Sequence, residues 1–168
     1  LVLEINNAQA ITTSPVITEF GQLYSVSASW DNAGNVALYV DGQLVETFTG
    51  ISTSYTMASG GQLVIAQDQD SLLGNFGDND TFNGTLYDLR IWNEVRSEAE
   101  ISLNHQHKFD SGSLPSGLIA NWQMDGFNGS NEVVDVVSGN NLSIGNAGAV
   151  AGFTASTPVE DLHISENA

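Results

Sequence analysis

The stretch LYSVSASWDNAGNVALYVDGQLVETF, residues 23–48, decides the fold class. Over its first eight residues apolar side chains alternate with three serines, and this period of two places the apolar set on one face of a β-strand. The turn-forming sequence DNAG and the dipeptide Asp41–Gly42 separate the strand-like runs that follow. We therefore predict an antiparallel meander of three strands with one buried face.

Further strand-like runs follow along the chain, at residues 61–66, 84–92, 118–125 and 132–137. They are short, and Gly, Pro, Asn and Ser punctuate the sequence between them. Many short strands at this spacing are typical of an all-β sandwich. The tryptophans fall within the alternating runs, and we expect them to pack in the core rather than to stack on sugars: Trp30, Trp92 and Trp122.

One segment, RSEAEISLNHQ at residues 96–106, is predicted to form a helix of roughly two or three turns. Ser97 and Glu100 have the spacing of a capping box, in which each side chain accepts a hydrogen bond from the other residue's backbone N–H. Ala99, Ile101 and Leu103 are expected to form the apolar face of this helix.

The composition is strongly acidic. The 168 residues contain 3 Lys and Arg against 20 Asp and Glu, a formal net charge of -17 at pH 7. So few cations cannot neutralise phosphates, which excludes a nucleic-acid partner. The absence of cysteine excludes disulfide frameworks and thiolate zinc sites. No apolar run approaches the roughly 18 residues that a membrane-spanning helix needs.

The densest group of acids is the stretch IAQDQDSLLGNFGDND, residues 65–80, which holds four aspartates and no Lys or Arg. It is long for a connection between two strands, which favours a functional role or a bound ion. Calcium takes six to eight oxygen ligands from carboxylates, amides, carbonyls and water, and this segment offers such oxygens densely. The segment predicts a calcium site, with a solvated acidic loop as the alternative.

Three stretches together resemble the pentraxin and laminin-G-like family: WDNAGNVALYVDGQLV at 30–45, GGQLVIAQDQDSLLGNF at 60–76 and FNGTLYDLRIWNEVRSEAEI at 82–101. The order of these motifs is similar to that of pentraxin-type domains. The resemblance covers about residues 1–125, with GLIANWQMD as the family's closing strand. It implies an antiparallel jelly-roll β-sandwich of the concanavalin A-like type with one short helix. It also implies that the chain lacks the N-terminal portion of the family's domain.

In that family the acidic loop binds two adjacent calcium ions, which in turn hold the ligand. By position, the resemblance implies four metal ligands here: the Asp68 carboxylate, the Gln69 backbone carbonyl, the Asp70 carboxylate between both ions and the Asp80 side chain at the second ion. The family's other ligands, an Asp–Asn pair, belong to the missing N-terminal portion, so the number of bound ions stays open. Ala66 stands where the family usually has glycine.

We expect residues 1–155 to form this domain and residues 156–168 to be a linker or the start of a following module. The resemblance implies a calcium-binding, lectin-like recognition or adhesion module of a larger extracellular or cell-surface protein. Its partner would be a carbohydrate or another anionic or hydroxyl-rich ligand. The alternative is a structural spacer module of a surface adhesin with no ligand of its own.

Jelly-roll sandwiches also include glycoside hydrolases, and the sequence argues against this third possibility. Paired catalytic carboxyls would alternate along one strand, as E-x-D-x-E or E-x-D-x-x-E, and neither pattern occurs. Glu132 and Asp135 are three residues apart, so they would face opposite sides of a strand. We therefore predict that the domain is not an enzyme.

Overall fold

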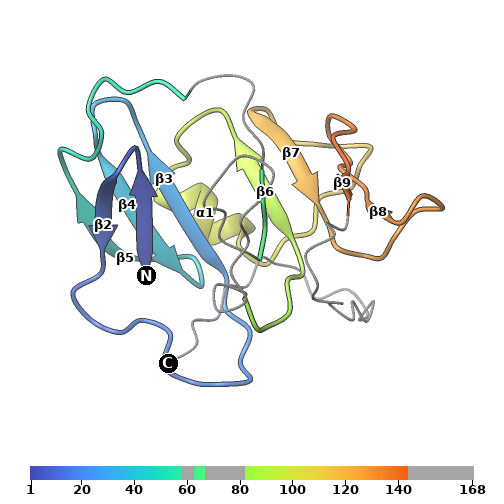
Figure 1. Ribbon diagram of the computed structural model, residues 1–168, viewed down its shortest axis with the longest axis horizontal. Helices are drawn as coiled ribbons and strands as arrows, with labels where there is room; N and C mark the ends of the chain where they lie inside the picture. Colours follow the sequence, from blue (N-terminus) through green and yellow to red (C-terminus); the bar gives the residue numbers. More distant parts are fainter. Residues whose placement is uncertain (58–62, 67–81, 144–168) are drawn as a thin grey trace.

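The computed structural model describes residues 1–57, 63–66 and 82–143 (Figure 1). Within these residues the chain forms short strands and one helix. In chain order they are β1 Val2–Ile5, β2 Ala8–Ile11, β3 Val26–Trp30, β4 Val36–Val40, β5 Gln43–Phe48, β6 Leu89–Trp92, α1 Glu98–Asn104, β7 Leu118–Trp122, β8 Glu132–Val133 and β9 Leu142–Ser143. The predicted content, mostly β with one short helix, is confirmed. The expected domain boundary at residues 155 and 156 lies outside the described residues.

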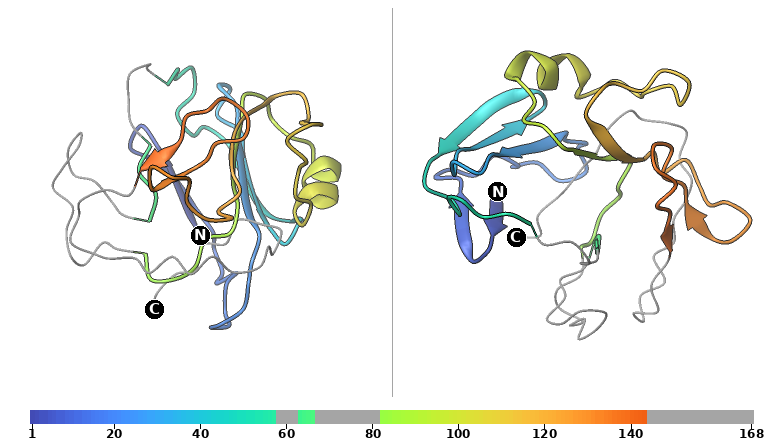
Figure 2. Two further views of the ribbon diagram at one scale, coloured as in Figure 1. Left: turned by 90° about the vertical axis from the view of Figure 1, so that its right-hand side faces the viewer. Right: turned by 90° about the horizontal axis from the view of Figure 1, so that it is seen from above.

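Every pairing between the described strands is antiparallel. The strands form four small sheets, β1-β2, β3-β4-β5, β6-β7 and β8-β9. Figures 1 and 2 show β1 to β5 gathered on one side of the molecule and β6 to β9 on the other, with α1 between the two groups. The two broad facing sheets of the expected sandwich are not complete within the part of the chain that the structure describes.

The meander predicted for residues 23–48 is present as β3, β4 and β5. β3 pairs with β4 in one continuous register, which sets Ala28 opposite Leu38. Asp41 and Gly42 join β4 to β5 with φ values of 49° and 73°. Positive φ at both central residues is what a type I′ turn requires, and the twist of that turn matches the twist of a hairpin. The Asp-Gly pair therefore fixes the end of β4.

Two apolar clusters hold the described part together. The first lies where the β1-β2 hairpin packs on the three-stranded sheet, and its buried members are Ala10, Val36 and Leu38. The second lies where the β6-β7 pair meets the β8-β9 pair, and its buried members are Ala120, Trp122 and Val133. Trp122 is therefore in the core, as predicted, whereas Trp30 and Trp92 are only half-buried.

Helix α1 begins at the capping box that the sequence predicts. The Ser97 hydroxyl accepts a hydrogen bond from the Glu100 backbone N–H at 3.3 Å, and the Glu100 carboxylate accepts one from the Ser97 N–H at 2.8 Å. Ile101 is buried. Ala99 and Leu103 are exposed, so the expected apolar face was too wide. Residues two apart on a helix do not share a face.

The buried carboxylate of Asp135 ties β7 to the β8-β9 pair. Its oxygens accept hydrogen bonds from the Ser138 hydroxyl and from four backbone N–H groups: Asn121 at 2.9 Å, Val137 at 3.0 Å, and Ser138 and Asn140 at 3.3 Å. Burial raises the pKa of this carboxyl, but the hydrogen bonds favour the ionised form and together lower the pKa below its ordinary value of 3.8. A single ionised side chain thus organises the turn after β8.

Replacing Asp135 with alanine is expected to lower the free energy of unfolding by roughly 2–4 kcal/mol, because several N–H groups lose a charged acceptor. Since the pKa of Asp135 is lower in the folded chain, its contribution is fully present above about pH 3.8 and is lost as the pH falls below that value. Urea unfolding at neutral pH and at about pH 3 measures both effects.

Asp125→Ala is the control for this measurement. It removes an ion pair between Lys108 and a half-exposed carboxylate, and it should cost under about 1 kcal/mol. Equal losses for the two variants at neutral pH would contradict the role given to Asp135.

Candidate functional site

The predicted calcium ligands Asp68, Gln69, Asp70 and Asp80 lie outside the described residues. The structure does describe the chain on both sides of the segment that contains them. The backbone N–H of Phe82 donates a hydrogen bond to the carbonyl of Ala66 at 3.0 Å. Residues 67–81 therefore leave the described part of the chain and rejoin it at one place, the Ala66–Phe82 junction.

Ala66 has a φ of 65°, in the left-handed region. A residue with a Cβ is strained there by roughly 1–2 kcal/mol, whereas glycine is not. This strain gives a physical reason for the glycine that the resemblance places at this position. We expected residues 61–66 to form a strand, but residues 63–66 pair with no strand in the described part of the chain.

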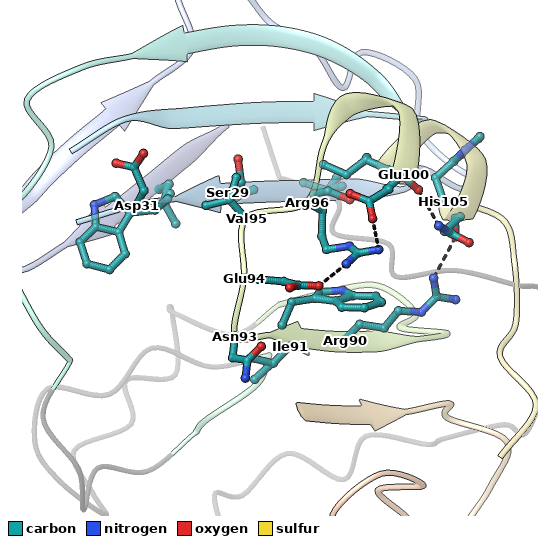
Figure 3. A pocket seen from close by; sticks show the side chains of 18 of the residues that line it. Ser29, Asp31, Arg90, Ile91, Asn93, Glu94, Val95, Arg96, Glu100 and His105 are labelled. Carbon is teal, nitrogen blue, oxygen red and sulfur yellow. Dashed lines mark hydrogen bonds and ion pairs between the residues drawn. The ribbon is translucent and has the colours of Figure 1, made fainter. Parts of the chain in front are cut away.

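A cavity of about 730 Å³ lies between β3 and β6, and we call it the β3–β6 groove. Residues 25–31, which include all of β3, form one wall, and residues 90–96 form the opposite wall. Residues of α1 close one end (Figure 3). Trp30 and Trp92 belong to these walls, and for this reason they are only half-buried.

Arg96 is held at the helix end of the β3–β6 groove. Its guanidinium pairs with the Glu100 carboxylate at 2.5 Å and with the Glu94 carboxylate, as Figure 3 shows. It also lies over the Trp92 ring, with Cζ 4.3 Å from the ring centroid. Hydrogen bonds from the backbone N–H and the hydroxyl of Ser97 lower the pKa of Glu100. This cation is thus balanced by neighbouring side chains.

A second charged group lies where β6 begins. The Asp88 carboxylate is 3% exposed, pairs with Arg90 and accepts a hydrogen bond from the side-chain amide of the fully buried Asn121. Arg90 also donates to the Asn104 carbonyl at 2.9 Å. Burial raises the pKa of Asp88, and the charge of Arg90 partly offsets this. The sequence analysis missed this cluster; an acid within the apolar run LYDLRIW was the available indication.

No group of three or more Asp, Glu or His residues that could hold a metal ion occurs within residues 1–57, 63–66 and 82–143. His105 has a ring nitrogen 2.8 Å from the Ser102 carbonyl. His107 packs edge-on against the Phe109 ring, with the centroids 5.3 Å apart. In the described part of the chain, the acid clusters therefore serve the fold.

Residues 2–102 match the family model described as the concanavalin A-like lectin/glucanases superfamily. The match covers more than half of the chain and runs from β1 into α1. The chain belongs to this superfamily. The fold-family expectation drawn from the sequence motifs is confirmed.

Curated relatives of this superfamily member include pentraxins. The chain is 30% identical over 101 residues to the rat sushi, von Willebrand factor type A, EGF and pentraxin domain-containing protein 1, covering 60% of the chain and 3% of that protein. It is 30% identical over 116 residues to C-reactive protein 1.1 of Limulus polyphemus, covering 68% and 48%. It is 32% identical over 96 residues to human pentraxin-4, covering 56% and 20%. The chain thus spans less than half the length of each of these relatives.

No solved structure matches the chain significantly. Among the described residues of this concanavalin A-like domain, no helix combines the length and the apolar character needed to cross a membrane.

Replacing Ala66 with glycine is expected to raise the free energy of unfolding by roughly 1 kcal/mol, because the φ of 65° is strained for alanine and free of strain for glycine. For a chain of this size, thermal unfolding should show a midpoint roughly 2–4 °C higher.

Ala37→Gly in β4 is the matched control. It removes the same methyl group at an ordinary strand position, and it should lower the free energy of unfolding by roughly 0.5–1 kcal/mol. If Ala66→Gly is neutral or destabilising, the backbone strain assigned to the Ala66–Phe82 junction is wrong.

Proposed function

We propose that this chain is a calcium-binding, lectin-like recognition or adhesion module of a larger extracellular protein. The observation that carries the proposal is the hydrogen bond from Phe82 to Ala66, which joins the two ends of the acid-rich segment. Membership of a superfamily whose description names lectins supports it. The four aspartates of residues 65–80 have no Lys or Arg beside them in the sequence, so a divalent cation is the natural counterion.

The proposed calcium ligands are the Asp68 carboxylate, the Gln69 backbone carbonyl and the carboxylates of Asp70 and Asp80. Asp80 lies ten residues beyond Asp70 in the sequence. A segment whose ends are joined brings such distant donors back toward each other, which supports a shared ion. Without metal the carboxylates repel one another, and calcium binding removes this repulsion.

Calcium takes more ligands than these residues supply. Positions of its coordination shell that the protein leaves open are filled by water or by oxygens of a partner. The proposed partner is therefore a carbohydrate or another anionic or hydroxyl-rich ligand, bound through the ion. The surplus of acids in the chain, with a net charge of -17, makes direct binding of an anion without metal unfavourable.

The proposed role is noncatalytic. The superfamily description names glucanases beside lectins, and the fold by itself does not decide between binding and hydrolysis. Carboxylates spaced for glycoside hydrolysis along one strand do not occur in the sequence, and the relatives described above include pentraxins. We also propose that the complete domain is a jelly-roll sandwich ending near residue 155, followed by a linker or a further module.

Calcium at 100 times its dissociation constant is expected to add about 2.7 kcal/mol to the free energy of unfolding. Thermal unfolding in EDTA and in excess calcium measures this difference. Asp70→Ala should abolish the calcium response, because it removes the carboxylate proposed to bridge the ions. Asp110→Ala, which changes an exposed turn carboxylate hydrogen-bonded to Gly112, should retain it. A calcium response that Asp70→Ala leaves intact would place the ion elsewhere.

Ligand binding is tested separately, on immobilised glycans and on phosphate-bearing surfaces in calcium and in EDTA. The recognition role predicts binding in calcium that EDTA reverses and that Asp70→Ala lacks. A protein that calcium stabilises but that binds none of these surfaces would instead support a spacer module, in which the ion stiffens the domain.

A further inference from the structure

The backbone of β3 has hydrogen-bonding groups directed into the β3–β6 groove. The Asp41 N–H donates to the Ser25 carbonyl at 2.8 Å, and the Asp31 N–H donates to the Asn35 carbonyl at 3.1 Å. In an antiparallel ladder alternate residues bond to the same neighbouring strand, so the odd-numbered residues from 25 to 31 bond to β4. The N–H and C=O groups of the even-numbered residues of β3 therefore point to its other edge.

That other edge has no strand beside it in the described residues, because β3 has β4 as its one neighbour there. Burial shows the same gap. Ala28, at the middle of β3, is exposed, although its register partner Leu38 is 2% exposed. A central strand would be covered on both edges, and an open edge with regularly spaced donors and acceptors is a template for another strand.

The opposite wall of the groove is also the edge of a sheet. β6 pairs with β7 and with no further strand among residues 1–57, 63–66 and 82–143. The four residues of β6 are half-buried, and residues 90–96 face the same cavity as β3. Two sheet edges thus line one groove along their length.

The charged groups of the groove do not favour a small ionic ligand. Arg96 is paired with Glu94 and Glu100, and Arg90 is paired with Asp88. The remaining lining is backbone, apolar side chains and serine hydroxyls of β3. A partner that recognises backbone groups and apolar side chains in alternation is an extended polypeptide, which binds by adding a strand to a sheet edge.

We propose that the β3–β6 groove holds one additional β-strand, which pairs with β3 and joins the β3-β4-β5 and β6-β7 sheets into a single sheet. The strand comes from a part of the full-length protein outside these 168 residues. The lengths of the relatives support this source, since the chain spans 48% of Limulus C-reactive protein 1.1 and the rest of that protein has no counterpart here. The net charge of -17 opposes the alternative of a second copy, because two such chains repel each other.

The chain contains no cysteine, so Ala28→Cys introduces a unique thiol into the groove. The measurement is the rate of maleimide labelling of this variant, in EDTA so that calcium plays no part. The probes are short overlapping synthetic peptides that cover the half of Limulus C-reactive protein 1.1 that the chain does not match. We expect fast labelling of the chain alone and labelling about tenfold slower with one peptide or with neighbouring peptides that share a strand.

Ser111→Cys, at an exposed turn, is the control thiol, and its labelling should be unaffected by every peptide. Ala28→Pro removes the N–H that points into the groove and leaves the bonds to β4 in place, so it should abolish the stabilisation by the active peptide in thermal unfolding. Ala28→Val retains the N–H and should keep that stabilisation, which controls for the fold of the variants.

Three results would overturn the proposal. They are slow labelling of Ala28→Cys in the chain alone, labelling that no peptide slows, and equal slowing at Ser111→Cys. Labelling of Ala28→Cys that slows with protein concentration and without peptide would show a second copy in the groove, and would reject the source proposed here.

Discussion

The hydrogen-bonded pairing of β3 with β4 is the constraint on which the rest of the structure depends. Its phase is fixed at both ends by backbone bonds of Ser25 and Asp31. Because side chains alternate along a strand, this phase turns the apolar residues of β3 toward the β1-β2 hairpin and its serines toward the other face. On β4, Tyr39 is buried, and burial and the nearby charge of Glu98 in α1 raise its pKa, so the helix lies beside it. A slip of one residue would exchange the two faces.

Two buried carboxylates show how an acidic chain places negative charge inside a small fold. Asp135 and Asp88 are each 3% exposed. The pKa of Asp135 is lowered, because four backbone N–H groups and a hydroxyl donate to it and outweigh the effect of burial. The pKa of Asp88 is raised, because burial outweighs the charge of Arg90 and the amide of Asn121. The number of donors around each carboxylate decides the direction. Acidification therefore weakens the fold at Asp135 and favours the folded state at Asp88.

Features set by neighbouring residues were predictable from the sequence, and features set by distant contacts were not. The Asp41–Gly42 turn, the capping box of Ser97 and the alternation in β3 each depend on a few adjacent residues, and each is present. The bond between Asp88 and Asn121 joins residues 33 apart in the chain, and the β3–β6 groove depends on which strand edges lie opposite each other. The candidate calcium site rests on the family resemblance, and of its surroundings the structure describes the Ala66–Phe82 junction. The positive φ of Ala66 explains a departure from the family that the sequence could only record.

The Ala66–Phe82 junction also bears on how such a domain can diversify. One backbone hydrogen bond separates the acid-rich segment from the strands on either side of it. The closure entropy of a flexible segment changes by only about 0.6 kcal/mol for each doubling of its length. Insertions, deletions and exchanges of residues between these two positions therefore leave the register of β6 and the packing around Trp122 intact. The domain behaves as a frame with a replaceable cassette, in which a new metal loop or a grafted binding peptide inherits two fixed ends.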